Sequence, residues 1–325
     1  MSTEERPAKR AREDTPAETS IIRSPDYWFD DGSIILQAEC TQFRVVKSLL
    51  AMHSTVFRDM FSMPLPVDEP LVEGCPVVVL AGDEAEDWKH LLKVMFPKEC
   101  FVNDVPKVEE LAGVLRLSKK YDIPSFRARA LSRFKAEFPT ELENYEGIRS
   151  EWVNISVDDG ISPLGIIVKG VNLARELGIY SILPCAFYLI VVAPTVVEDM
   201  RGETFAKLAP ADQVLCLQGY IALVQTHKET PSQWLSSAQV PSPGCTSPAA
   251  CESARKDLLI QLGASAYNVV RVLAPWDEIA ALKVCSPCRT AGRFAFDAAR
   301  EKCWQKLPTY FGLPPWEELL KMDFE

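Results

Sequence analysis

The stretch FRVVKSLLAMHSTVFRDMF, residues 43–61, decides the fold of the first part of this chain. Its first three residues have the character of a short β-strand. The spacing then becomes helical, because Leu49, Met52 and Val56 fall on one helix face. Ser54 lies within the helical part, and its hydroxyl can accept a hydrogen bond from a free backbone N–H at the start of a second helix. The stretch therefore predicts a strand followed by two short helices.

Apolar runs on both sides of this stretch extend the pattern. The turn-forming sequence Asp30-Asp31-Gly32 precedes one run, and Cys75-Pro76 leads into another that is β-branched. Further along, apolar residues recur at helical spacing. The additional predicted elements are strands at 34–36 and 77–80 and helices at 83–95, 108–115 and 126–138. We therefore expect an α+β fold between residues 24 and 138, in which helices flank a small β-sheet.

This order of elements resembles the BTB/POZ domain. The resemblance is carried by FRVVKSLL at 43–50, STVFRDMF at 54–61 and LSKKYDI at 117–123. A narrower set of segments is similar to BTB proteins that are abundant in mushroom-forming (basidiomycete) fungi. These segments are YWFDDG at 27–32, GCPVV at 74–78 and LPTYFGLPPW at 307–316.

The resemblance implies a non-catalytic module that binds other proteins, either by self-association or as an adaptor or scaffold. Glu73, in Leu71-Val72-Glu73, lies near the place where BTB adaptors carry a short contact for cullin scaffolds of ubiquitin ligases. Val46 and Ser33 stand where the family usually has His and Asp, which weakens the polar pocket that some BTB dimers use. The apolar residues expected at a homodimer contact are Val45, Leu49, Leu50 and Met52.

The remaining sequence predicts a mainly α-helical C-terminal domain over residues 139–325. Its clearest helical periodicity covers 164–177, 182–192 and 213–224. Residues 1–23 mix Pro, Ser and Thr with charges of both signs, so we expect a disordered tail. Within this tail, the basic cluster at 9–12 reads either as a nuclear-import signal or as a solvated charge run.

Four of the ten cysteines form two pairs that border predicted helices, Cys245 with Cys251 and Cys285 with Cys288. Zn²⁺ binds four thiolates at tetrahedral corners, and a C-x2-C turn can direct two sulfurs at one ion. The first pair has five intervening residues, more than is usual, so four unlinked thiols remain the alternative. A site with four protein sulfurs would be structural, because it leaves no position for a substrate. The other cysteines have no such spacing and are expected to fill apolar space.

Charge and composition exclude several functions. A net charge of -10 disfavours direct nucleic-acid binding. No apolar run reaches the roughly 18 residues of a membrane span, and the N-terminus is too polar for a secretory signal. We therefore expect an intracellular protein, cytoplasmic or nuclear, without direct nucleic-acid or membrane contact.

Enzyme signatures are sparse. The sequence lacks nucleotide-binding glycine loops, a G-x-S-x-G elbow and H-E-x-x-H, and it holds only three histidines. We therefore expect that the protein is not an enzyme. The alternatives for a binding protein are BTB-mediated self-association or scaffolding, a substrate adaptor of a cullin ubiquitin ligase, and a transcriptional co-regulator that does not contact DNA.

Overall fold

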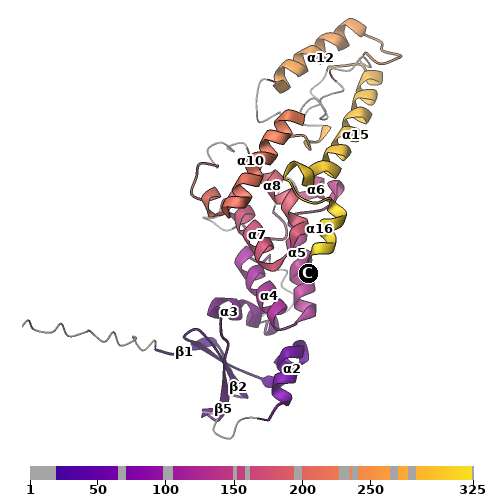
Figure 1. Ribbon diagram of the computed structural model, residues 1–325. Helices are drawn as coiled ribbons and strands as arrows, with labels where there is room; N and C mark the ends of the chain where they lie inside the picture. Colours follow the sequence, from indigo (N-terminus) through magenta and orange to yellow (C-terminus); the bar gives the residue numbers. More distant parts are fainter. Residues whose placement is uncertain are drawn as a thin grey trace, which may run out of the picture. The chain divides into compact units, whose positions relative to one another are not determined.

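The computed structural model describes residues 20–64, 71–97, 105–148, 152–157, 162–193, 200–226, 235, 241–263, 270–276 and 283–323. The chain divides into two compact units, Met1–Phe96 and Pro97–Glu325 (Figure 1). The boundary predicted at residue 138 stays a prediction. The basic cluster at 9–12 lies outside the described residues.

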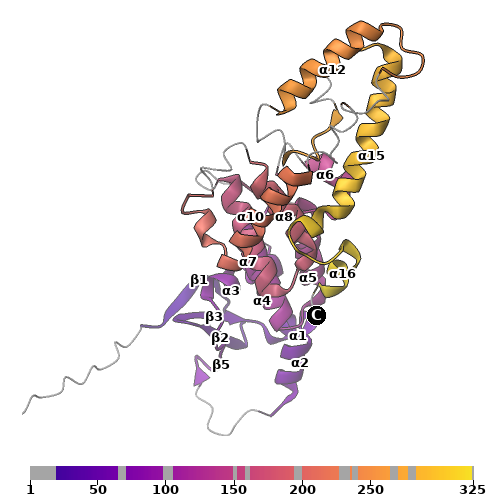
Figure 2. The same ribbon diagram turned by 45° about the horizontal axis from the view of Figure 1, so that its top comes forward.

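The first unit is built on a five-stranded sheet with the order β1-β3-β2-β5-β4, of which Figure 2 labels β1, β3, β2 and β5. β2 and β3 form an antiparallel hairpin in which Leu36 lies opposite Phe43. β1 pairs with β3 and β5 pairs with β2, both in parallel. The strands are β1 (Ile22–Trp28), β2 (Ile34–Ala38), β3 (Thr41–Val45), β4 (Leu71–Val72) and β5 (Cys75–Val79).

Three helices complete this unit: α1 (Lys47–His53), α2 (Thr55–Ser62) and α3 (Ala85–Met95). The predicted cap at Ser54 is confirmed, because its Oγ accepts a 3.0 Å hydrogen bond from the backbone N–H of Phe57. Glu39, in the β2–β3 turn, similarly accepts from the first N–H of α3, at Ala85, over 3.0 Å. A local cap thus fixes the start of α2, and a contact between residues distant in sequence fixes the start of α3.

The second unit is helical, as predicted. A buried apolar core joins most of its helices, and α8 is buried around nearly its whole circumference. The elements are α4 (Val108–Lys120), α5 (Pro124–Glu137), α6 (Leu142–Ile148), α7 (Pro163–Leu177), η1 (Tyr180–Ile182), α8 (Leu183–Val191), η2 (Phe205–Lys207), α10 (Pro210–Gln225), α12 (Pro248–Gly263), α15 (Ser286–Tyr310) and α16 (Trp316–Met322).

A second, smaller apolar cluster lies apart from this main core. It contains Leu258 from α12, Phe296 from α15 and Trp276 between them. The rings of Trp276 and Phe296 meet edge to face with centroids 5.4 Å apart. Because α15 also contributes Trp304 to the main core, this helix connects the two clusters.

Candidate metal centre

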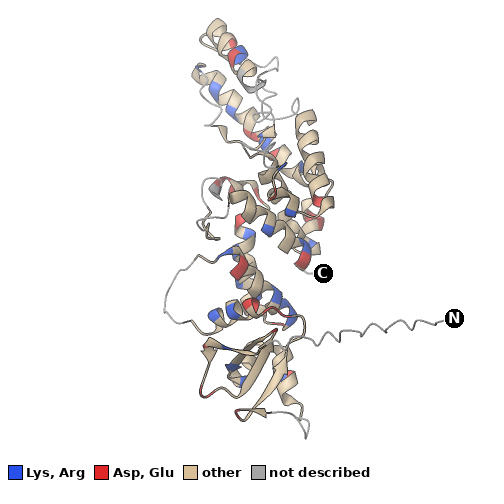
Figure 3. Cartoon of the chain, turned by 90° about the vertical axis from the view of Figure 1, so that its left-hand side faces the viewer, with Lys and Arg blue, Asp and Glu red and all other residues tan. Residues whose placement is uncertain are grey.

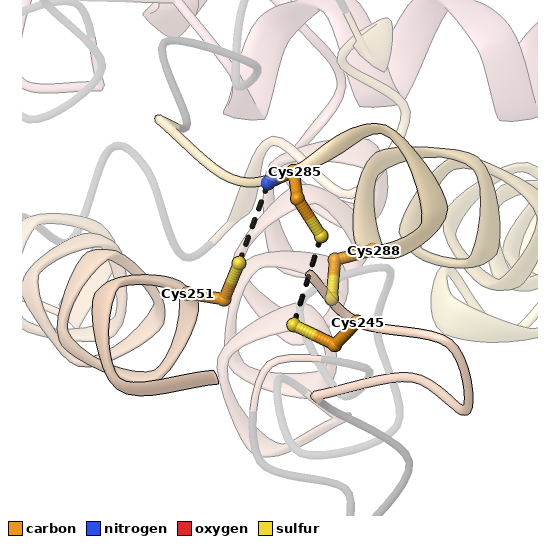
Figure 4. A group of neighbouring side chains, drawn as sticks. All are labelled: Cys245, Cys251, Cys285 and Cys288. Atoms are coloured by element: carbon orange, nitrogen blue, oxygen red, sulfur yellow. Dashed lines mark hydrogen bonds between the residues drawn. The ribbon is translucent and has the colours of Figure 1, made fainter. Parts of the chain in front are cut away.

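The four cysteines predicted as a metal site come together at the small cluster. Their Sγ atoms all lie within 4.8 Å of one another. The Sγ atoms of Cys245 and Cys285 are 3.6 Å apart, and Figure 4 shows all four side chains converging. In a tetrahedral zinc site with Zn–S bonds of about 2.3 Å, neighbouring sulfurs lie about 3.8 Å apart. The cluster therefore has the size and donor set of a site that could hold one metal ion.

Two helix starts deliver these side chains. Cys251 lies in the first turn of α12, and Cys245 precedes that helix at the end of a turn from Ser242, within which Gly244 has φ 88°. Cys285 is the N-cap of α15, and Cys288 lies in its first turn. The partial positive charge at a helix N-terminus stabilises a nearby thiolate. Each pair thus offers one sulfur before a helix and one within it.

Hydrogen bonds to sulfur reinforce this arrangement. The backbone N–H of Cys285 donates to Cys251 Sγ over 3.3 Å. The backbone N–H and the hydroxyl of Ser242 both donate to Cys288 Sγ over 3.4 Å. The spacing of the cysteines did not identify Ser242, and its only sequence signal is its place in the Ser-Pro-Gly turn before Cys245. These donors satisfy sulfur lone pairs that a metal ion would leave free.

The environment separates the pKa values of two of the thiols. Backbone N–H groups of Cys288 and Thr246 donate to the sulfur of Cys285 and lower its pKa to about 6. Loss of contact with water raises the pKa of Cys245 to about 12. Of these two thiols, Cys285 therefore ionises at the lower pH and is the better thiolate donor to a metal.

The residues predicted at a homodimer contact do not share one surface. Val45 and Leu50 are buried in the first unit, Leu49 is half-buried, and Met52 is 67% exposed. A partner can reach Met52 directly, whereas Val45 and Leu50 are occupied by the unit's own core. The homodimer contact stays a prediction, and on α1 it would rest on Met52 and Leu49.

Glu73 lies at an exposed turn with φ 51°. Its carboxylate oxygens pair with Arg23 at 2.6 Å and with Arg44 at 3.3 Å. Arg44 also donates to the carbonyl oxygens of Asp30 and Gly32. Glu73 therefore joins the β4–β5 turn to β1 and β3, so a partner that bound Glu73 would compete with these two arginines.

Lys and Arg side chains on α4 and α5 are largely engaged within their own unit. Arg116 pairs with Glu176 at 2.7 Å, and Lys135 pairs with Asp323. Figure 3 shows Lys and Arg interspersed with Asp and Glu along the helices. His53 and His90 belong to the first unit, whereas the cysteine cluster belongs to the second, and His227 lies outside the described residues.

Comparison with known protein families gives a match over part of the chain. The BTB/POZ domain model matches residues 31–135, from the turn before β2 to near the end of α5. No curated protein shows significant similarity to the chain. Within the part of the chain that the structure describes, no helix is long and apolar enough to cross a membrane.

Proposed function

We propose that this chain is a non-catalytic adaptor or scaffold that contacts other proteins, including a second copy of itself, through its BTB/POZ domain. The observation that carries this proposal is the family match over residues 31–135, in the part of the chain that forms the predicted small sheet and its helices. BTB/POZ domains are protein–protein interaction modules.

Two measurements test this function. Affinity purification of the tagged full chain from its native cells, followed by mass spectrometry, should recover a reproducible protein partner. Met52→Glu should weaken any self-association that runs through α1, while Glu86→Gln on α3 serves as an exposed control in the same unit. Recovery of no partner, together with a monomer at all concentrations, would overturn the proposal.

The second candidate function is a substrate adaptor for a cullin ubiquitin ligase. Glu73 supports it, because this carboxylate is exposed and lies near the place where BTB adaptors carry a cullin contact; a cullin that bound it would displace Arg23 and Arg44. Co-purification with a cullin that Glu73→Ala abolishes would distinguish the adaptor from a simple scaffold. A transcriptional co-regulator without DNA contact is the third candidate, and nuclear exclusion of the tagged protein would count against it.

We further propose that the cysteine cluster holds one structural Zn²⁺. The donor set supports this choice, because four thiolates suit Zn²⁺ and leave no coordination position for substrate. The small apolar cluster gives the ion a role, since few buried side chains otherwise hold α12 against α15. Elemental analysis of the purified full chain should find one zinc per chain, and its absence after purification without chelators would contradict the proposal.

A further inference from the structure

Helix α10 presents an apolar face to solvent. Val214, Leu217, Ile221 and Val224 are 51%, 47%, 54% and 40% exposed. Their spacing of three, four and three residues aligns them along one side of the helix, as the a and d positions of a coiled-coil seam do. The opposite side, with Cys216, Gly219 and Leu223, is buried against the rest of the unit. The exposed residues are therefore not needed for the helix's own core, and we call them the α10 stripe.

The α10 stripe carries no charge. Between Asp212, which is buried and paired with Arg175 at 2.6 Å, and Lys228 the sequence has no charged residue. Exposed helix faces of monomeric proteins normally carry charged residues, and an uncharged apolar face marks a contact with another macromolecule. A partner with charges at the contact would have to desolvate them without compensation, so the occupant must itself be apolar.

The sequence of the helix identifies that occupant. It reads nearly the same in both directions from Gly219: Gln213 mirrors Gln225, Val214 mirrors Val224, and Leu217 mirrors Ile221. When the stripes of two identical helices pack antiparallel about a two-fold axis at the level of Gly219, the mirrored residues face each other across the contact. Valine then meets valine and leucine meets isoleucine, so each layer has side chains of matched size.

The glutamines at the two ends fit the same arrangement. Gln213 Nε2 donates to the carbonyl oxygen of Leu208 over 2.8 Å, so its amide oxygen is the atom that can accept a hydrogen bond from the amide of Gln225 in the second copy. Charged residues at these positions would repel their counterparts or need a partner of opposite sign. We infer that the α10 stripe is an antiparallel self-association site that binds α10 of a second copy of this chain.

The contact is weak by itself. Four half-exposed aliphatic side chains cover much less than the roughly 800 Å² per partner of a standard interface. We therefore expect a reversible association that becomes visible as the protein concentration rises through the micromolar range. This contact is distinct from any self-association through the BTB/POZ domain, with which it would combine into larger assemblies.

The test uses charge at the facing positions of the full chain. One variant carries Leu217→Lys with Ile221→Lys, and a second carries Leu217→Glu with Ile221→Glu. Within either variant, like charges face each other, so self-association should weaken more than tenfold in sedimentation experiments. An equimolar mixture of the two variants places Lys opposite Glu and should restore association. Ile260→Lys with Phe294→Lys adds the same charge at exposed apolar residues outside the stripe and should behave as wild type.

The outcomes separate this site from the BTB/POZ contact. Any self-association that remains in the lysine variant runs through another surface. If the BTB/POZ domain does not self-associate, the loss of association in the lysine variant still reports on the stripe. Far-UV circular dichroism should show unchanged folding, because the substituted side chains are about half exposed. The inference is wrong if the lysine variant sediments like wild type, or if the mixture associates no better than its components. A stripe that binds a helix of another protein would also give these results.

Discussion

At the scale of single residues, the thiols differ in what surrounds them. Cys185 and Cys216 are buried among apolar side chains, and burial raises the pKa of both. Thiols with such surroundings stay protonated and bind metal poorly. Cys251, Cys285 and Cys288 instead accept hydrogen bonds from backbone N–H groups, which stabilise thiolates. Backbone donors therefore distinguish Cys251, Cys285 and Cys288 from the two core thiols. Cys245, whose pKa desolvation also raises, is identified by its spacing and its place in the cluster.

Two buried cysteines on the same helix allow a matched comparison. Cys288 is 1% exposed and belongs to the cluster, whereas Cys303 is 4% exposed and belongs to the main core. Cys288→Ser replaces a thiolate with a hydroxyl that binds Zn²⁺ poorly, so the zinc content after dialysis should fall well below one per chain. Cys303→Ser should retain the metal. Equal zinc content in both variants, measured by elemental analysis, would rule out Cys288 as a ligand.

Glu137 offers a second prediction at this scale. It is 2% exposed, and Oε1 accepts hydrogen bonds from the backbone N–H groups of Val153, Asn154 and Ile155. Glu137→Gln keeps an oxygen that can accept these three bonds but replaces charge-assisted bonds with weaker neutral ones. We expect a loss of about 1.5 to 3 kcal/mol in unfolding free energy, measured by urea denaturation.

The exposed Glu143 on α6 supplies the control for this measurement. Glu143→Gln should change the unfolding free energy by less than about 0.5 kcal/mol, because surface substitutions away from special contacts have small effects. If Glu137→Gln and Glu143→Gln lower the unfolding free energy by the same amount, the three backbone hydrogen bonds of Glu137 do not stabilise the fold as argued.

At the scale of elements, α10 shows packing overriding helix propensity. Replacing a mid-helix glycine with alanine should stabilise the helix by about 1 kcal/mol. At Gly219, however, a Cβ atom would lie 2.1 Å from ring atoms of Phe311. Displacing this buried ring costs typically 1 to 3 kcal/mol, so Gly219→Ala should lower the melting temperature. Gln218→Ala, at the exposed neighbouring position, should leave it unchanged or raise it slightly, and a higher melting temperature for Gly219→Ala would refute the packing argument.

The sequence predicted those elements whose signals are local. Ser54 marked the start of α2, and the helical periodicity over 164–177 marked α7, which Ser162 Oγ caps by accepting from Gly165 N–H over 3.2 Å. Strand β1 was missed, because Pro25 and polar neighbours obscure its alternation and its pairing with β3 is non-local. The spacing of the cysteines predicted which four would meet. It could not predict Ser242, whose contact with Cys288 exists only after the chain folds.

At the scale of the whole molecule, the stability of the second unit is unevenly distributed. The main core gathers side chains from α4 to α16, including the stacked rings of Trp304 and Trp316, whose centroids are 5.4 Å apart. The small cluster rests on a few residues of α12 and α15 together with the cysteines. Structural zinc sites contribute roughly 10 to 16 kcal/mol of apparent binding free energy, which is at least comparable with what so few buried side chains supply.

Metal removal should therefore unfold one part of this unit and spare the other. A zinc chelator added to the full chain should reduce the helical circular dichroism of α12 and the start of α15. It should also expose Trp276, which is 4% exposed in the small cluster, and shift its fluorescence to the red. The thermal transition of the main core should move by only a few degrees, because its contacts do not include the cysteine cluster.

Trp276→Phe identifies the source of the optical signal. This variant should lose the fluorescence shift on chelation and keep the loss of helical signal, since phenylalanine preserves most of the apolar contact with Phe296. Readdition of Zn²⁺ should reverse both changes in the unsubstituted chain. Two results would show that α12 and α15 are not held together by a local metal site. One is that chelation leaves fluorescence and helicity unchanged, and the other is that removal of the metal unfolds the whole second unit in a single transition.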